Sequence, residues 1–121
     1  MNILVVDDDE IIRVFLTKVL SRFGAVTTAA NGVNGMDVFR HTGGGFDIVF
    51  TDRRMPGGMF GEEVVRQIKM LSPRTRVILM SGDDPREVAE VGRAAGADKI
   101  LFKPIRLEEI EGAVSEALSR K

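Results

Sequence analysis

Acidic residues follow directly after an apolar run near the amino terminus. Residues Ile3–Val6 are apolar, and Asp7, Asp8 and Asp9 come next. Adjacent carboxylates repel one another, and the pKa of each rises unless a cation lies between them. Oxygen ligands from one or two carboxylates, completed by water and phosphate, are the ligands that Mg²⁺ prefers. Acids at this point therefore indicate a magnesium site if further acids join them, although Asp9 is also placed to cap a helix.

Three more polar side chains follow later apolar runs, and together they could act on a phosphate group. They are Asp52, Ser81 and Lys103. A carboxylate can attack phosphorus to form an acyl phosphate. The transition state of phosphoryl transfer spreads negative charge over its oxygens, so catalysis consists mainly of positioning and electrostatic stabilisation. We predict that Asp52 is the nucleophile and that Lys103 and the Ser81 hydroxyl each stabilise one oxygen.

The elements that must position these residues alternate along the chain. Five short apolar runs are typical of strands covered on both faces, and segments with helical periodicity separate them. This alternation predicts an α/β fold, a doubly wound five-stranded parallel sheet with five helices on its two faces. Ligands bind beyond the carboxyl ends of such strands, where the polar residues lie. The predicted strands are Ile3–Val6, Ala25–Ala29, Phe46–Thr51, Arg76–Met80 and Lys99–Phe102.

The helices differ in how strongly the sequence specifies them. The first has one apolar stripe from Ile12 to Phe23, and Asn31 is placed to cap the second. The Gly43–Gly45 run should end that second helix. The segment Pro85–Ala95 predicts a weak fourth helix because its inner face carries small residues, including a glycine. We expect this fourth helix to be the easiest to move.

The composition is that of an ordinary globular domain. The chain has 121 residues, a formal net charge of −1 and no cysteine. This length suits a single domain spanning residues 1–121. The charge balance and the lack of a basic face argue against direct nucleic-acid binding. No apolar run reaches the roughly 18 residues of a membrane span, and no basic segment precedes the first run. We therefore expect a cytoplasmic domain with no membrane partner.

Four motifs in order resemble the receiver (response-regulator) domain family of two-component signalling, of which the chemotaxis regulators are an example. The resemblance covers essentially the whole chain, and Gly96-Ala97-Asp98 fits the same pattern. It implies a flavodoxin-like sheet with strand order 2-1-3-4-5, in agreement with the alternation above. The motifs are Val5-Val6-Asp7-Asp8-Asp9-Glu10, Phe50-Thr51-Asp52-Arg53-Arg54-Met55-Pro56, Met80-Ser81-Gly82 and Phe102-Lys103-Pro104.

The resemblance also implies a role for each site residue. Asp52 would be the phosphoacceptor, Ser81 the hydroxyl residue of the conformational switch and Lys103 the phosphate-contacting lysine. Asp8 would be a direct ligand of Mg²⁺ within the acidic pair. The implied metal site consists of Asp7, Asp8, Asp52 and the backbone carbonyl of Arg54.

The same resemblance implies a signalling function. Receiver domains take a phosphoryl group from a phosphohistidine on a sensor histidine kinase, or from a phosphotransfer protein, and later hydrolyse it. The chain is then a signalling domain with magnesium-dependent autophosphorylation and autodephosphorylation activity, not a metabolic enzyme. Phosphorylation would shift the surface of the fourth helix, fifth strand and fifth helix to control an unknown downstream protein. Charges on these helices could also serve a phosphorylation-dependent dimer.

Two features depart from the usual receiver pattern. Family members often carry an aromatic residue three positions before the lysine, where this chain has Ile100. Ile100 is either a switch residue with a branched aliphatic side chain or an ordinary strand residue. The loop Met55–Gly61 is one residue longer than the common form and resembles a segment of receivers attached to hybrid histidine kinases. Within it, Phe60 is expected to pack as the first apolar residue of the third helix.

Arg53 and Arg54 form an unusual pair beside the predicted acceptor. They could attract the phosphodonor or shield an acyl phosphate from water, but arginines on a loop are more often exposed and solvated, and we expect this of the pair. Asp83, two residues after Ser81, is expected to pair with Arg54 across the mouth of the site.

Two other functions are open at this point. A haloacid-dehalogenase-type phosphatase uses an aspartate after its first strand, in an Asp-x-Asp motif that Asp7–Asp9 supplies. It would leave Asp52 without a role, and the chain is short for that family. A pure interaction module with a vestigial site is disfavoured because every residue type needed for the chemistry is present.

Overall fold

The computed structural model describes residues 1–119 and contains one five-stranded sheet between two layers of helices. All neighbouring strands are parallel, and their order is β2-β1-β3-β4-β5, which confirms the predicted α/β fold. The strands are β1 (Asn2–Val6), β2 (Ala25–Ala29), β3 (Ile48–Asp52), β4 (Arg76–Ser81) and β5 (Lys99–Phe102).

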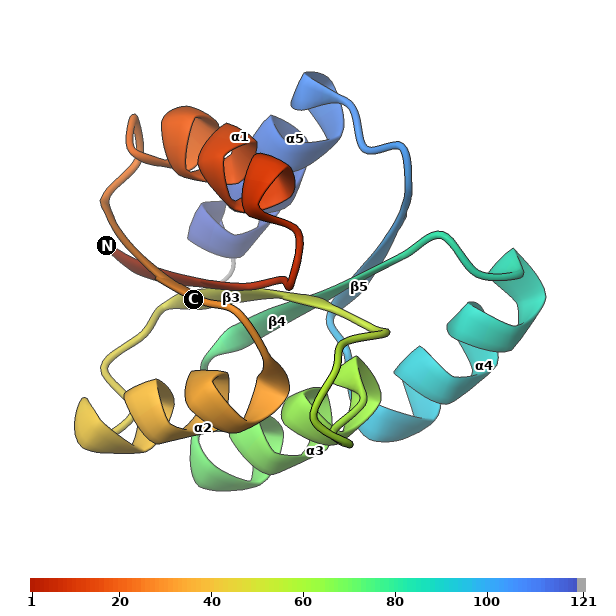
Figure 1. Ribbon diagram of the computed structural model, residues 1–121. Helices are drawn as coiled ribbons and strands as arrows, with labels where there is room; N and C mark the ends of the chain where they lie inside the picture. Colours follow the sequence, from red (N-terminus) through yellow and green to blue (C-terminus); the bar gives the residue numbers. More distant parts are fainter. Residues whose placement is uncertain (120–121) are drawn as a thin grey trace.

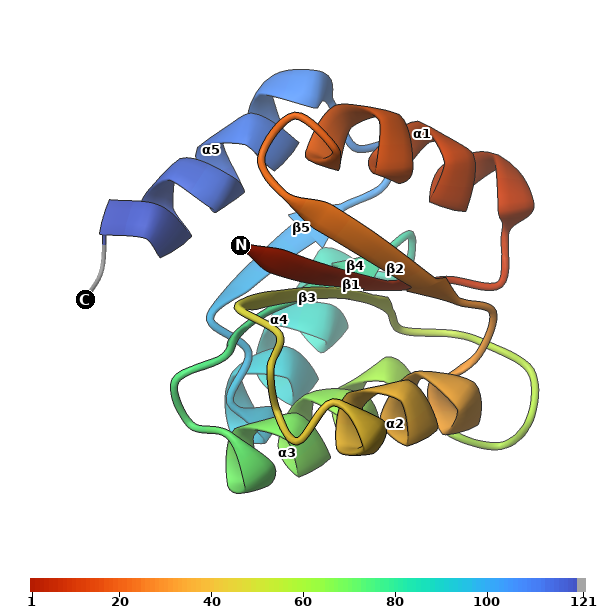
Figure 2. The ribbon, with the colours of Figure 1, turned by 90° about the vertical axis from the view of Figure 1, so that its left-hand side faces the viewer.

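Helices cover both faces of the sheet. Helices α1 and α5 lie on one face, and α2, α3 and α4 lie on the other (Figure 1). Turning the molecule by 90° shows the same two layers (Figure 2). None of these helices is long and apolar enough to cross a membrane. They are α1 (Glu10–Leu20), α2 (Gly32–His41), α3 (Gly61–Leu71), α4 (Pro85–Ala95) and α5 (Leu107–Ser119).

Alternate residues of the central strands form two separate cores. In β1, Leu4 and Val6 pack with residues of α2, α3 and α4, whereas Ile3 and Val5 pack with residues of α1 and α5. All four side chains are fully buried. Each such side chain contributes about 1.5–3 kcal/mol relative to an exposed one, and a one-residue slip in register would move every side chain of the strand into the core on the opposite face. The strand register that positions the site is therefore strongly fixed.

Local signals begin and end the helices as the sequence predicts. Asp9 caps α1 by accepting a hydrogen bond from the Ile11 amide at 2.9 Å, and Asn31 caps α2 in the same way. Gly43 and Gly44, both with positive φ, follow the end of α2. The first helix is shorter than its apolar stripe, because α1 ends at Leu20 and Phe23 packs on the core from the following turn.

Helix α4 has the predicted bounds and lies very close to the sheet. A Cβ atom on Gly92 would lie 2.8 Å from Cδ1 of Ile100 and 3.1 Å from Cδ2 of Leu79. Only glycine allows this approach without displacement of the helix. Ile100 is therefore half-buried between β5 and α4, packed against the core.

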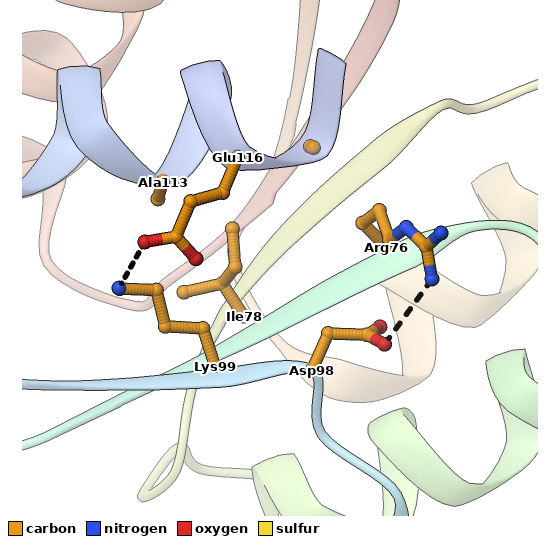
Figure 3. Close-up of a pocket in the computed structure, with 7 residues that line it drawn as sticks. Arg76, Ile78, Asp98, Lys99, Ala113 and Glu116 are labelled. Atoms are coloured by element: carbon orange, nitrogen blue, oxygen red, sulfur yellow. Dashed lines mark hydrogen bonds and ion pairs between the residues drawn. The ribbon is translucent and has the colours of Figure 1, made fainter. Parts of the chain in front are cut away.

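Ion pairs join the elements at the opposite end of the sheet from the predicted site. Asp98 pairs with Lys69 of α3 at 2.9 Å and with Arg76 of β4 at 3.5 Å, and it also accepts a hydrogen bond from the Val77 amide. In the shallow pocket of Figure 3, the Asp98–Arg76 pair lies beside a pair between β5 and α5. Because the cations of this pocket are paired with acids, we assign it a structural role.

Candidate functional site

Four strands bring polar side chains together at the carboxyl edge of the sheet. Asp7 directly follows β1, and Asp52 is the last residue of β3. Oxygen atoms of Asp7, Asp8 and Asp52 lie within 4.8 Å of one another. Asp7 and Asp52 are buried, whereas Asp8 is exposed. The predicted acids thus form one cluster that opens to solvent on the side of Asp8.

Lys103 provides the cation that contacts this cluster. Its Nζ atom lies 3.1 Å from Oδ1 of Asp52 and 3.2 Å from Oδ2 of Asp7. It follows β5 directly, and its peptide bond to Pro104 is cis. The lysine side chain is three-quarters buried, so its charge is only weakly screened by solvent. One ammonium group therefore bridges two carboxylates.

The carboxylates nevertheless hold more negative charge than the lysine neutralises. Burial, reinforced by the charge of Asp7, raises the pKa of Asp52 from its ordinary value of 3.8 to about 6, although Lys103 opposes this shift. Burial also raises the pKa of Asp7, and the Asp9 amide and Lys103 oppose it. The pKa of Lys103 is raised because the two carboxylates outweigh the effect of burial.

This donor set fits a hard divalent cation. It consists entirely of carboxylate oxygens, it carries excess negative charge, and one of its members faces solvent. Hard cations such as Mg²⁺ take oxygen ligands and usually keep several waters, so a half-open acidic cluster is suitable. Arg54 lies two residues beyond Asp52 in the loop at the same edge of the sheet.

Comparison with known proteins identifies the family. The sequence profile of the response regulator receiver domain matches residues 3–115. The chain belongs to the response regulator receiver domain family. This receiver is 33% identical over 121 residues to the sporulation initiation phosphotransferase F of Bacillus subtilis, covering 99% of this chain and 95% of that protein.

Two further proteins show how this receiver compares with longer regulators and with solved structures. It is 34% identical to the two-component response regulator ARR14 of Arabidopsis thaliana, but spans only 32% of the length of that protein. The beryllofluoride-activated receiver domain of DrrB, from Thermotoga maritima, superposes with a TM-score of 0.87 at 33% identity. The match covers 98% of this chain and 97% of that one. The fold and the family are thus established independently.

The hydroxyl group of this receiver lies on the neighbouring strand. Ser81 is buried at the end of β4, and its Oγ atom accepts a hydrogen bond from the Asp83 amide at 3.0 Å. Asp52 is in register with Met80, the residue before Ser81. The hydroxyl is therefore held by the loop that leads into α4.

The two arginines after Asp52 differ from each other. The predicted pair between Arg54 and Asp83 is confirmed, with Nε and Oδ2 2.7 Å apart. The expectation of an exposed Arg53 was wrong: its side chain is only 4% exposed, because it pairs with Glu62, Asp83 and Glu87.

The expectation for Phe60 was also wrong. It lies before α3 at the cap position and is 41% exposed, and its ring lies 5.8 Å from Arg53 Cζ and 5.5 Å from Arg54 Cζ. A cation attracts the face of an aromatic ring, so the arginines, not the core, hold Phe60. Sequence reasoning missed Glu62 and Glu87 as partners. Their positions in the first turns of α3 and α4 were the available signal.

The raised pKa of Asp52 predicts a pH-dependent gain in stability on its removal. A rise from 3.8 to about 6 corresponds to about 3 kcal/mol, since one pKa unit is about 1.4 kcal/mol. The folded state binds the proton more tightly, so this carboxyl destabilises the fold above pH 6 and has no such effect below pH 4. In metal-free protein, Asp52→Asn should therefore raise the free energy of unfolding by about 2–3 kcal/mol at pH 7.5.

Urea unfolding of both proteins between pH 4 and pH 8 measures this difference. The gain should shrink as the pH falls through 6 and disappear near pH 4. A gain that stays constant over the whole range would mean that ionisation of the buried Asp52 carboxyl is not its cause. The matched control is Asp37→Asn, which removes an exposed acid of α2.

Proposed function

We propose that this receiver is a phosphorylation-dependent signalling switch in which Asp52 accepts a phosphoryl group from a phosphohistidine. The observation that carries the proposal is the buried Asp52 carboxylate, which contacts Lys103 within an acidic cluster. The donor is a sensor histidine kinase, including one of the hybrid type, or a phosphotransfer protein. The relative named sporulation initiation phosphotransferase F supports a place in such a chain of transfers.

The residues of the cluster divide the chemistry between them. An oxygen of Asp52 forms a bond to phosphorus while the P–N bond of the phosphohistidine breaks, and the imidazole leaves with the electron pair. Lys103 stabilises one phosphoryl oxygen, and the Ser81 hydroxyl donates a hydrogen bond to another. Later attack by water on phosphorus releases phosphate and restores Asp52.

The metal proposed for this site is Mg²⁺. Asp7, Asp8 and Asp52 would hold it, together with the backbone carbonyl of Arg54. When bound, it supplies positive charge that offsets the charge developing on the phosphoryl oxygens. Lys103 contacts the carboxylates of both Asp7 and Asp52, so one positive charge faces at least two acids. The chain's own residues would then provide the nucleophile, one cation and one hydroxyl donor.

The effect of phosphorylation would be a shift in population. Movement of Ser81 toward the phosphoryl group would draw the loop after β4 and bias α4, whose contact with Ile100 through Gly92 connects it to β5. The surface of α4, β5 and α5 would then control a downstream protein or a dimer. We place this activity in one domain over residues 1–121, in the cytoplasm. The chain has autophosphorylation and autodephosphorylation activity and no metabolic substrate.

An apolar groove beside the cluster is the proposed docking surface for the phosphodonor. It lies between α1 and the segment after β5, and Lys103 belongs both to its lining and to the acidic cluster. The donor must bring its phosphohistidine to Asp52. Its surface therefore has to cover the groove next to Lys103. A helical surface with apolar side chains fits this groove. The lining residues are Ile11, Ile12, Phe15, Leu16, Lys103, Pro104 and Ile105.

A charged substitution in this groove should slow phosphoryl transfer from a protein donor but not from a small-molecule donor. Ile11 is 79% exposed, so Ile11→Asp leaves the core intact. It should slow transfer from a purified phosphohistidine domain about tenfold or more, because an unpaired charge would be buried on docking. Acetyl phosphate needs no such surface, and its reaction rate should not change.

The control for this prediction is Met70→Asp, which places the same charge on an equally exposed position at the end of α3. Transfer rates are measured by intact mass against time, using the phosphohistidine domain that reacts fastest among a purified panel. Equal rates for Ile11→Asp and Met70→Asp would place the docking surface elsewhere.

The direct test of the proposed function is the intact mass after incubation with acetyl phosphate and Mg²⁺. One phosphoryl group that depends on Asp52 is the expected result.

A further inference from the structure

A buried arginine connects the acidic cluster to α4. The guanidinium group of Arg53 donates to Glu62 at 3.2 Å, to Asp83 at 3.1 Å and to Glu87 at 3.2 Å. Burial would lower the pKa of Arg53, but hydrogen bonds and charges from Glu62 and Glu87 raise it overall. The three acids therefore compensate the buried charge.

The three acids belong to three different elements. Glu62 lies in the first turn of α3, Asp83 in the loop after β4, and Glu87 in the first turn of α4. The backbone of Arg53 is fixed to the centre of the sheet, since its amide donates to the Met80 carbonyl at 2.9 Å. The side chain consequently ties α3, the loop after β4 and α4 to the central part of the sheet.

The Arg53 backbone also contacts the predicted acceptor. Its amide donates to Oδ1 of Asp52 at 3.0 Å, the oxygen that also contacts Lys103. Its carbonyl accepts a hydrogen bond from the Gly61 amide at the start of α3. A residue in direct contact with the acceptor carboxylate thus also holds α4 in place.

The same network restrains the Ser81 hydroxyl. The Asp83 amide donates to Ser81 Oγ, while Oδ2 of Asp83 accepts from both Arg53 and Arg54. If Ser81 turns toward a phosphoryl group, the loop carrying Asp83 has to move against these bonds. The ring of Phe60 lies near both guanidinium groups, of which that of Arg53 is buried and that of Arg54 is exposed.

We infer that Arg53 is a positioning residue whose ion pairs hold α4 in its unphosphorylated position. This inference rests on the proposed function and adds its regulation. Each ion pair stabilises the unswitched state, so weakening one pair raises the fraction of molecules that are already switched. A ligand that binds only the switched state then binds more tightly.

Glu87→Gln is the variant that tests this inference. Glu87 is 53% exposed, and Glu62 and Asp83 still compensate Arg53 when it is neutralised, so the fold is retained. The ligand is beryllofluoride with Mg²⁺, a mimic of the phosphoryl group, and its affinity is measured by titration calorimetry. We expect about fivefold tighter binding to Glu87→Gln than to wild type.

The control variant is Glu90→Gln, which removes the same charge from an exposed position of the same helix. Its affinity for beryllofluoride should equal that of wild type. Hydrogen exchange of α4 amides without beryllofluoride should be faster in Glu87→Gln than in Glu90→Gln. A merely structural role for Glu87 could also speed this exchange, but it would not tighten binding.

The outcomes distinguish a failure of the inference about Arg53 from a failure of the proposed function. Binding to Glu87→Gln that equals or is weaker than binding to wild type would refute the role of Arg53 and leave the proposed function standing. A wild-type protein that takes up no beryllofluoride in the presence of Mg²⁺ would refute both.

Discussion

Acetyl phosphate with Mg²⁺ should add one phosphoryl group to the wild-type protein and none to Asp52→Asn. The amide of asparagine has nearly the same shape as the carboxylate, but it is not a nucleophile toward phosphorus. Without Mg²⁺ the wild-type protein should also remain unmodified, because the acidic cluster repels an anionic donor. Lys103 is one positive charge shared between Asp7 and Asp52, and the charge of Asp7 still adds to burial in raising the pKa of Asp52 to about 6. Intact mass with and without Mg²⁺ measures all of these states.

Two more variants make this experiment decisive. Asp8→Asn removes the exposed acid of the cluster, and it should require far more Mg²⁺ for the same yield. Asp37→Asn removes an exposed acid of α2 and should behave as wild type. An adduct that persists in Asp52→Asn would place the nucleophile at another acid, such as Asp7 in the phosphatase alternative. No adduct on the wild-type protein would favour an interaction module.

Replacing Lys103 by methionine should have two large effects. The first is a loss of stability in metal-free protein, because Asp7 and Asp52 would face each other without their shared cation. Removing one partner of a buried ion pair costs about 3 kcal/mol or more. This sign is opposite to that expected for Asp52→Asn, so the two variants together test the repulsion within the cluster.

The second effect of Lys103→Met should be slower phosphorylation. One charged donor to the phosphoryl oxygens is lost, and removing one such donor typically lowers the rate about 10²-fold or more. Urea unfolding measures the free energy of unfolding. The rate of adduct formation at saturating Mg²⁺ measures the rate of phosphorylation. The surface variant Lys99→Met, which loses a pair with Glu116, is the control. An unchanged rate for Lys103→Met would remove this lysine from the mechanism.

The sequence predicts the strands and the positions of the acids well because both follow from local patterns. Continuous apolar runs identify strands that are covered on both faces, and parallel strands bring Asp7 and Asp52 to the same edge. Helix α4 was predicted with its observed bounds, and in the structure Asp84 caps its start and Gly96, with positive φ, ends it.

The environment of Arg53 could not be predicted in the same way. An arginine in a loop is usually solvated, and its burial depends on carboxylates from separate elements meeting at one point. Glu62 and Glu87 are 25 residues apart in the sequence, and only the packing of α3 beside α4 joins them through one guanidinium group. Phe60 was misplaced for the same reason, because its partners are these arginines and not the core.

The positions of the start of β1 and the end of α5 have a practical consequence. Strand β1 begins, and helix α5 ends, on the side of the sheet away from the acidic cluster (Figure 2). A fluorophore, an affinity handle or a surface anchor attached next to the start of β1 or the end of α5 would therefore leave the cluster and the α1 groove free. An immobilised form of this receiver could serve as a biosensor element, because the fold leaves the acidic cluster and the α1 groove facing away from the point of attachment.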